Sequence, residues 1–103
     1  MEKTIKRSTL MNKLGAVMSI RNLVSPRSWR PVANQFESVH RNGTSFQSYE
    51  TLIAVRLGGK LYLTDAHDCS KTTSKYATEW TGYNTSERRI GLEEGRFIRI
   101  VED

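Results

Sequence analysis

The feature that most limits the possible folds is the dipeptide Asn42-Gly43, which lies between two segments rich in aromatic and β-branched residues. Asparagine and glycine tolerate the positive φ angles that tight hairpin turns require. The sequence therefore predicts a β-hairpin whose strands cover residues 32–40 and 45–49. Within it, Phe46 is expected to face the core and Tyr49 to lie at its rim.

A second hairpin is predicted immediately afterwards. Residues 51–57 are mostly apolar and β-branched, which is typical of a strand in the centre of a sheet. Gly58-Gly59 marks a turn, and residues 60–64 form the returning strand. Alternation along that strand places Leu61 and Leu63 on one face and Tyr62 on the other.

The N-terminal part of the chain has two interpretations. An apolar stripe through Leu10, Leu14, Val17 and Met18 fits one helix, which Gly15 would weaken. The alternative, which we prefer, is a helix over residues 8–14 followed by a strand over 16–24. Pro26 and Pro31 then bound a loop, since proline disfavours helix at the preceding residue.

The C-terminal half favours helices. Ser70 can cap a helix that runs to about Thr81 and ends at Gly82, after a loop over residues 65–69. Thr85 or Ser86 can cap a second short helix, and residues 97–101 alternate as a final strand. The predicted fold class is α+β: a small single domain, residues 24–103, built on an antiparallel β-meander and preceded by a basic segment, residues 1–23.

Size and composition agree with this prediction. The chain has 103 residues, which suits one domain, and it is 37% hydrophobic and 26% charged. No apolar run approaches the roughly 20 residues that span a bilayer, so no membrane partner is expected. The single cysteine cannot form an internal disulfide, which makes a reducing cytoplasm the simplest compartment.

The positive charge is concentrated at one end of the sequence. Residues 1–30 carry seven lysines and arginines against one acidic residue, a net charge of +6, whereas residues 31–103 carry nine against ten, a net charge of −1. Such asymmetry favours contact with nucleic acid or an acidic protein. The alternative is a solubilising, partly frayed leader.

Candidate catalytic and metal-binding residues are few. His67 and Cys69 stand beside Asp65 and Asp68, with only His40 available from elsewhere, whereas a structural zinc site needs about four ligands, commonly in paired clusters. A cysteine nucleophile needs a positioned base, which two nearby loop residues do not establish. We therefore expect a solvent-facing His67 and a half-buried Cys69, no catalytic residues, no metal, no cofactor and no enzyme activity.

Two polar and aromatic groups are candidate binding residues. Arg27, Trp29 and Arg30 lie in the proline-bounded loop, where guanidinium groups could contact phosphate and the indole could stack on a base. The alternative is that Trp29 fills the core and the cations are ordinary solvated charges.

Lys71, Lys75 and Tyr76 form the second group, on the helix that Ser70 caps. Lys71 and Lys75 share a helix face, and the free N–H groups of a helix N-terminus favour anions. Here too Tyr76 could instead belong to the core. Arg88 and Arg89 are expected on a solvated helix face.

Several segments resemble a family of small uncharacterised proteins that are encoded by bacteriophages, prophages and plasmids. The resemblance covers about residues 24–99 and depends on the segments NQF (34–36), NGTSFQSYETLIA (42–54), GKLYL (59–63), SKTTSKY (70–76) and EEGRF (93–97). It implies a mobile-element origin and a site of action in the cytoplasm of a bacterial host cell. It brings no established activity and no catalytic residue.

The sequence departs from that family at one place. Family members tend to have aromatic residues before the Ser-x-Thr-Thr-x-Lys-Tyr element, where this chain has Ala66-His67-Asp68-Cys69. A stacking role at those positions is therefore not implied here.

Two function classes follow. The preferred one is a non-enzymatic accessory protein that binds nucleic acid through its basic and aromatic surface. The alternative is a protein-binding inhibitor or modulator of a host enzyme or anti-phage defence complex, with an aromatic and arginine-rich contact surface. A homodimer joined through an exposed sheet edge is compatible with both.

Overall fold

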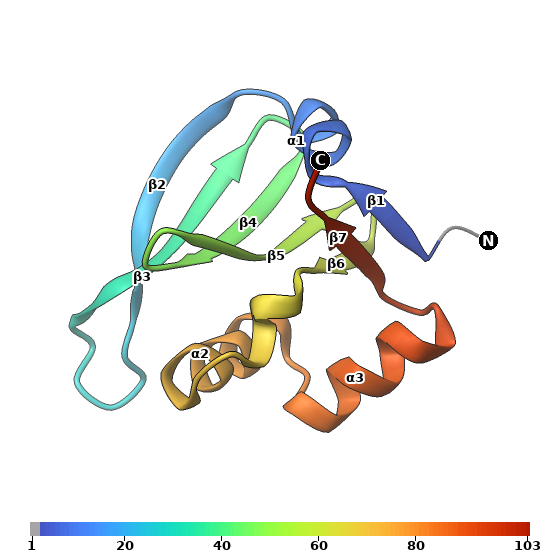
Figure 1. The fold of residues 1–103 in the computed structure, drawn as a ribbon. Coiled ribbons are helices and arrows are strands. Elements are labelled where there is room, and N and C mark those ends of the chain that lie inside the picture. The colour runs from blue at the N-terminus through green and yellow to red at the C-terminus, as the bar shows by residue number, and fades with distance from the viewer. Residues whose placement is uncertain (1–2) are drawn as a thin grey trace.

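The computed structural model describes residues 3–103, which form one seven-stranded sheet with helices on both faces (Figure 1). Strand β7 is parallel to both of its neighbours, and all other pairs are antiparallel. The strands in spatial order are β1 (Thr4–Lys6), β7 (Ile98–Val101), β6 (Lys60–Leu63), β5 (Thr51–Leu57), β4 (Gly43–Ser48), β3 (Pro31–His40) and β2 (Val17–Val24).

The helices divide the core into two parts. Helices α2 (Lys71–Thr81) and α3 (Thr85–Glu94) cover one side of the sheet, the α2 face, and helix α1 (Arg7–Leu14) covers part of the other, the α1 face (Figure 1). Leu61 and Leu63 pack in the core of the α2 face and Tyr62 in that of the α1 face, as the alternation predicts. The architecture is a small α+β domain whose helices lie mostly in its C-terminal half and which ends in a strand, as predicted. No helix of the described residues is long and apolar enough to cross a membrane.

The N-terminal residues follow the preferred interpretation. Helix α1 ends at Gly15, whose φ of 78° breaks the helix, and strand β2 follows. The single long helix is therefore wrong. Leu10 and Leu14 are fully buried against the α1 face.

The two hairpins differ in their turns. Gly58 and Gly59 both have positive φ, as expected for a tight turn. The expected positive φ at Asn42-Gly43 is wrong, because neither residue has it. Gly43 is needed for another reason: a Cβ there would lie 2.3 Å from the carbonyl oxygen of Arg56 on β5.

The helix boundaries agree with the sequence, with two corrections. Helix α2 begins after Ser70, whose side chain accepts from the Thr73 amide, and ends at Gly82. Helix α3 is capped by Asn84, one residue earlier than predicted, in a capping box with Glu87. The expected loop at residues 65–69 contains a short 3-10 helix, η1 (Asp65–Asp68).

Candidate functional site

The loop between β2 and β3 presents its tryptophan to solvent. Trp29 is 80% exposed and adopts a φ of 58°, and its amide donates to the carbonyl of Ser25 over 2.9 Å. Arg27 and Arg30 beside it are also exposed. The alternative in which the Trp29 indole fills the core is therefore wrong. The core tryptophan is Trp80 on α2.

The predicted residues of α2 are partly exposed. Lys71 and Lys75 face solvent, whereas Tyr76 is half-buried and packs against the core of the α2 face. The ammonium of Lys75 lies 5.2 Å from the centre of the Tyr76 ring. Tyr76 therefore supports the core and offers only part of its ring to a partner.

These two groups lie at the same end of the sheet, which we call the loop end. The hydroxyls of Ser48, the last residue of β4, and Thr73 are 3.1 Å apart, so the N-terminal part of α2 sits where β4 ends. The β2–β3 loop projects beyond the same end and toward the same side as α2 (Figure 1). No hydrogen bond or ion pair within residues 3–103 links the two groups directly.

The basic N-terminal charge does not form one patch. Lys3, Lys6 and Lys13 belong to the region of β1 and α1, and β1 is at the opposite edge of the sheet from β2. Arg7 pairs with Glu102, and Arg21 pairs with Glu37. Only Arg27 and Arg30 of this segment reach the loop end.

Backbone strain is concentrated at the loop end. The non-glycine residues with positive φ among the described residues are Trp29, Asn34 and Tyr49, at 58°, 63° and 55°. All three belong to the loop, the base of β3 or the β4–β5 turn. Because such conformations are unfavourable and cluster at functional sites, they mark this end of the molecule.

Asn34 and Tyr49 also line a shallow surface cavity of about 600 Å³ that is wide open to solvent. Phe36 and Gln47, which face each other across β3 and β4, form its floor on the α1 face. No residue of α1 lines it. The remaining lining residues are Glu50 and Thr51.

A buried amide lies on the opposite face of the same hairpin. Gln35 is fully buried opposite Ser48, yet neither polar atom of its side chain has a hydrogen-bond partner. Most buried polar groups in proteins are paired. The described residues therefore supply no hydrogen-bond partner for the Gln35 amide.

The free edge of the sheet is apolar. Strand β2 is the last strand in the order, and it exposes Val17, Met18, Ile20 and Val24 to solvent. Exposed apolar edge strands offer unpaired backbone groups to another chain. This edge is continuous with the loop that carries Trp29.

A second hollow, of about 510 Å³, lies at the other end of the sheet, around the Gly58-Gly59 turn. Two of the three cationic side chains that line it, Arg56 and Arg96, form contacts within the protein. The guanidinium of Arg56 donates to the carbonyls of Trp80 and Thr81 at the end of α2, and Arg96 pairs with Glu94. These contacts stabilise the helix ends and leave less charge for a ligand.

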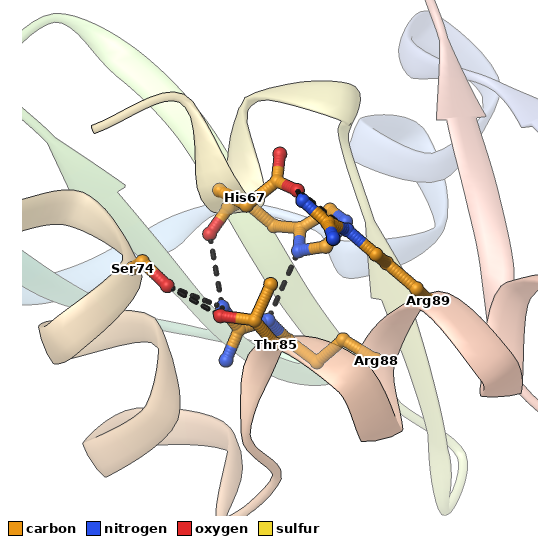
Figure 2. Close-up of polar contacts among 6 residues, drawn as sticks. His67, Ser74, Thr85, Arg88 and Arg89 are labelled. Carbon is orange, nitrogen blue, oxygen red and sulfur yellow. Dashed lines mark hydrogen bonds and ion pairs between the residues drawn. The ribbon is translucent and has the colours of Figure 1, made fainter. Parts of the chain in front are cut away.

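The residue that sequence reasoning misjudged most is Arg88. Its side chain is fully buried and bonds only neutral acceptors, of which His67, Ser74 and Thr85 are drawn in Figure 2. The partners come from η1, α2, the α2–α3 connection and α3: His67 Nδ1, the carbonyls of His67 and Tyr83, and the hydroxyls of Ser74, Thr78 and Thr85. The prediction of a solvated Arg88 is wrong, because these acceptors replace water. Arg89 is exposed and pairs with Asp68, as a surface residue would.

The same network corrects the prediction for His67 and Cys69. His67 is buried, 4% exposed, and its Nδ1 accepts from Arg88 Nε over 3.0 Å, so its Nε2 carries the proton (Figure 2). Burial lowers the pKa of His67; Asp68 opposes this shift, and Arg88 and Arg89 add to it. Cys69, expected to be half-buried, is exposed.

Within residues 3–103, no group of three or more histidine, cysteine, aspartate or glutamate side chains is placed to hold a metal ion. The buried His67 serves the network around Arg88 rather than activating Cys69. The chemistry that the loop end can offer is recognition: phosphate contact by arginine and stacking by aromatic rings.

Comparison with known proteins gives one match. Residues 18–98 match a family of unknown function (DUF8033). The match begins six residues before the segment that resembled phage, prophage and plasmid proteins. No curated protein and no solved structure gives a significant match.

Proposed function

We propose that this chain, which belongs to the family of unknown function (DUF8033), is a non-enzymatic protein that binds nucleic acid at its loop end. The observation that carries the proposal is Trp29, which is 80% exposed between two exposed arginines. An indole exposed to solvent beside two arginines leaves its ring face open to a ligand. Stacking on a base would cover this face.

The charge around Trp29 supports the proposal. Arg27 and Arg30 form no ion pair among the described residues, unlike Arg21 on the adjacent strand, which is engaged by Glu37. A free guanidinium group can form a bidentate pair of hydrogen bonds with a phosphate. Lys71 and Lys75 on α2 add two more cations at the same end of the sheet.

The proposed setting is the cytoplasm of a bacterial host, where the chain would act as an accessory protein of a phage or plasmid. The segments that resemble phage, prophage and plasmid proteins support this setting.

The proposal is tested by fluorescence anisotropy with labelled DNA and RNA over a range of salt. Because each neutralised phosphate releases counterions, Arg27→Ala and Arg30→Ala should each reduce the slope of log affinity against log salt by about one. Trp29→Ala should weaken binding about tenfold or more, the loss expected for one stacked base. Arg96→Ala, at the other end of the sheet, is the matched control. Absence of binding at low salt, or equal behaviour of all variants, refutes the proposal.

A second candidate function is supported by the apolar edge of β2. An extended segment of another protein could pair with this strand and bury Met18 and Ile20, as in inhibitors or modulators that act by strand addition. Ile20→Lys would place a charge on that edge. A stoichiometric host partner that survives nuclease treatment and is lost from Ile20→Lys supports this function. Light scattering of the isolated protein distinguishes a homodimer through the same edge.

A further inference from the structure

We infer that the cavity between Phe36 and Tyr49 binds a nucleobase, and that the protein therefore prefers single-stranded nucleic acid to a duplex. This inference rests on the proposed function and adds to it the class of ligand. The cavity is independent of Trp29, Lys71 and Lys75: it lies on the α1 face and takes its lining from β3, β4 and the β4–β5 turn.

The position of the cavity connects it to the exposed loop. Strand β3 leaves the loop at Pro31, and Asn34 on the cavity wall follows Arg30 by only four residues. The loop projects toward the side of α2 (Figure 1), so a polynucleotide whose phosphates contact Arg27 and Arg30 passes around the end of β3 to place a base in the cavity on the α1 face.

The lining has the chemistry of a base site rather than a phosphate site. Two aromatic side chains, Phe36 and Tyr49, offer stacking surfaces, and the amides of Asn34 and Gln47 can read the edge of a base. No lysine or arginine lines the cavity, and Glu50 does. A carboxylate repels a phosphate but accepts hydrogen bonds from the N–H groups of a base.

Two short hydrogen bonds join the residues that line the cavity. The Tyr49 amide donates to the carbonyl of Asn34 over 2.6 Å, and Gln47 Nε2 donates to the carbonyl of Tyr49 over 2.6 Å. The second bond leaves Gln47 Oε1 as a free acceptor. Asn34 and Tyr49 are the residues with strained φ at this site, so the strain positions the walls of the cavity.

The class of nucleic acid follows from access. Bases inside a duplex are stacked and paired, and a side chain that stacks on a base needs it unstacked. Phe36 is half-buried in the sheet and Tyr49 lies directly after β4, so neither can enter a duplex. The base must come to the cavity, and a single strand supplies it without the cost of unpairing and unstacking that a duplex base carries.

The experiment compares three ligands of equal length: a single-stranded oligonucleotide, a base-free phosphodiester strand and a duplex. The wild-type protein should bind the single strand about a hundredfold more tightly than the base-free strand, because Trp29 and the cavity each stack about one base, and it should also prefer the single strand to the duplex. Tyr49→Ala should reduce the preference over the base-free strand about tenfold without changing affinity for the base-free strand itself. Ile90→Ala, an exposed apolar residue of α3, is the matched control and should leave the preference intact.

The outcomes separate the inference from the proposed function. If Tyr49→Ala keeps the full preference for the single strand over the base-free strand, the nucleobase site in the cavity is overturned and nucleic-acid binding at Trp29 stays in place. Absence of binding to all three ligands overturns both, and points to the protein partner instead. If Tyr49→Ala does not fold, the NMR signals of the Asn34 and Gln47 side-chain amides give the answer in the wild-type protein. They must shift with the single strand and not with the base-free strand.

Discussion

Arg88 provides a sharp test of what holds the helical layer together. Replacing it by methionine keeps a long apolar side chain and removes the guanidinium that joins η1, α2 and α3. The consequences differ among its partners, because some acceptors have another hydrogen bond and some do not.

The size of the effect can be worked out from those partners. The hydroxyls of Ser74 and Thr85 bond each other over 2.6 Å, so both remain paired without Arg88. The Nδ1 and carbonyl oxygen of His67 have no other hydrogen bond among the described residues. Each buried group left unpaired costs about 1–3 kcal/mol, offset in part because no charge is buried any longer. We therefore expect Arg88→Met to lower the free energy of unfolding by about 2–4 kcal/mol.

Thermal unfolding followed by circular dichroism measures this loss. For a domain of about this size, 2–4 kcal/mol corresponds to a fall in Tm of about 10–25 °C. Arg89→Met is the matched control, because Arg89 is the next residue and its exposed pair with Asp68 should contribute only about 0–1 kcal/mol. If Arg88→Met loses no more than Arg89→Met, the buried network does not stabilise the fold and the reasoning is refuted.

Two further predictions concern buried polar side chains. Because burial holds the pKa of His67 below its ordinary value of 6.5, the unfolded chain binds more protons than the folded one between these two pKa values. The contribution of His67 to the free energy of unfolding should therefore be constant above about pH 6.5 and fall as the pH drops toward the lowered pKa. His67→Gln keeps an acceptor for Arg88 and should flatten this pH profile in urea titrations. An unchanged profile would contradict the assignment. Gln35→Leu should raise the urea midpoint by the equivalent of about 1 kcal/mol, because it removes an unpaired buried amide; a lower midpoint would show that the amide has a partner in solution.

Local signals in the sequence were enough to predict most elements. Ser70 and Gly82 bound helix α2 as predicted, and the Gly58-Gly59 turn joins β5 to β6. Each of these signals acts over a few residues, through a cap or a permitted φ. The Asn84 cap could also have been predicted, because Asn84 and Glu87 have the spacing of a capping box.

The strand order, the burial of Arg88 and the exposure of Trp29 could not be predicted from such local signals. Strand periodicity does not say that β7 inserts between β1 and β6, because that order depends on a crossover. Arg88 was predicted to lie with Arg89 on a solvated helix face, because its acceptor His67 is 21 residues away and no spacing rule connects the two residues. The exposure of Trp29 likewise depends on packing, because a tryptophan in a sequence gives no sign of whether the core has room for it.

The hairpin of β3 and β4 explains why fold and binding surface coincide at the loop end. On one face of the hairpin Phe46 packs against Trp80 in the core, and Ser48 hydrogen-bonds to Thr73. On the other face Phe36 and Gln47 form the floor of the cavity. Since strand residues alternate between faces, a one-residue slip would exchange the two sets and destroy both the core and the cavity. The same register that buries the core therefore fixes the cavity, and the strain at its walls is sustained by the packing on the opposite face.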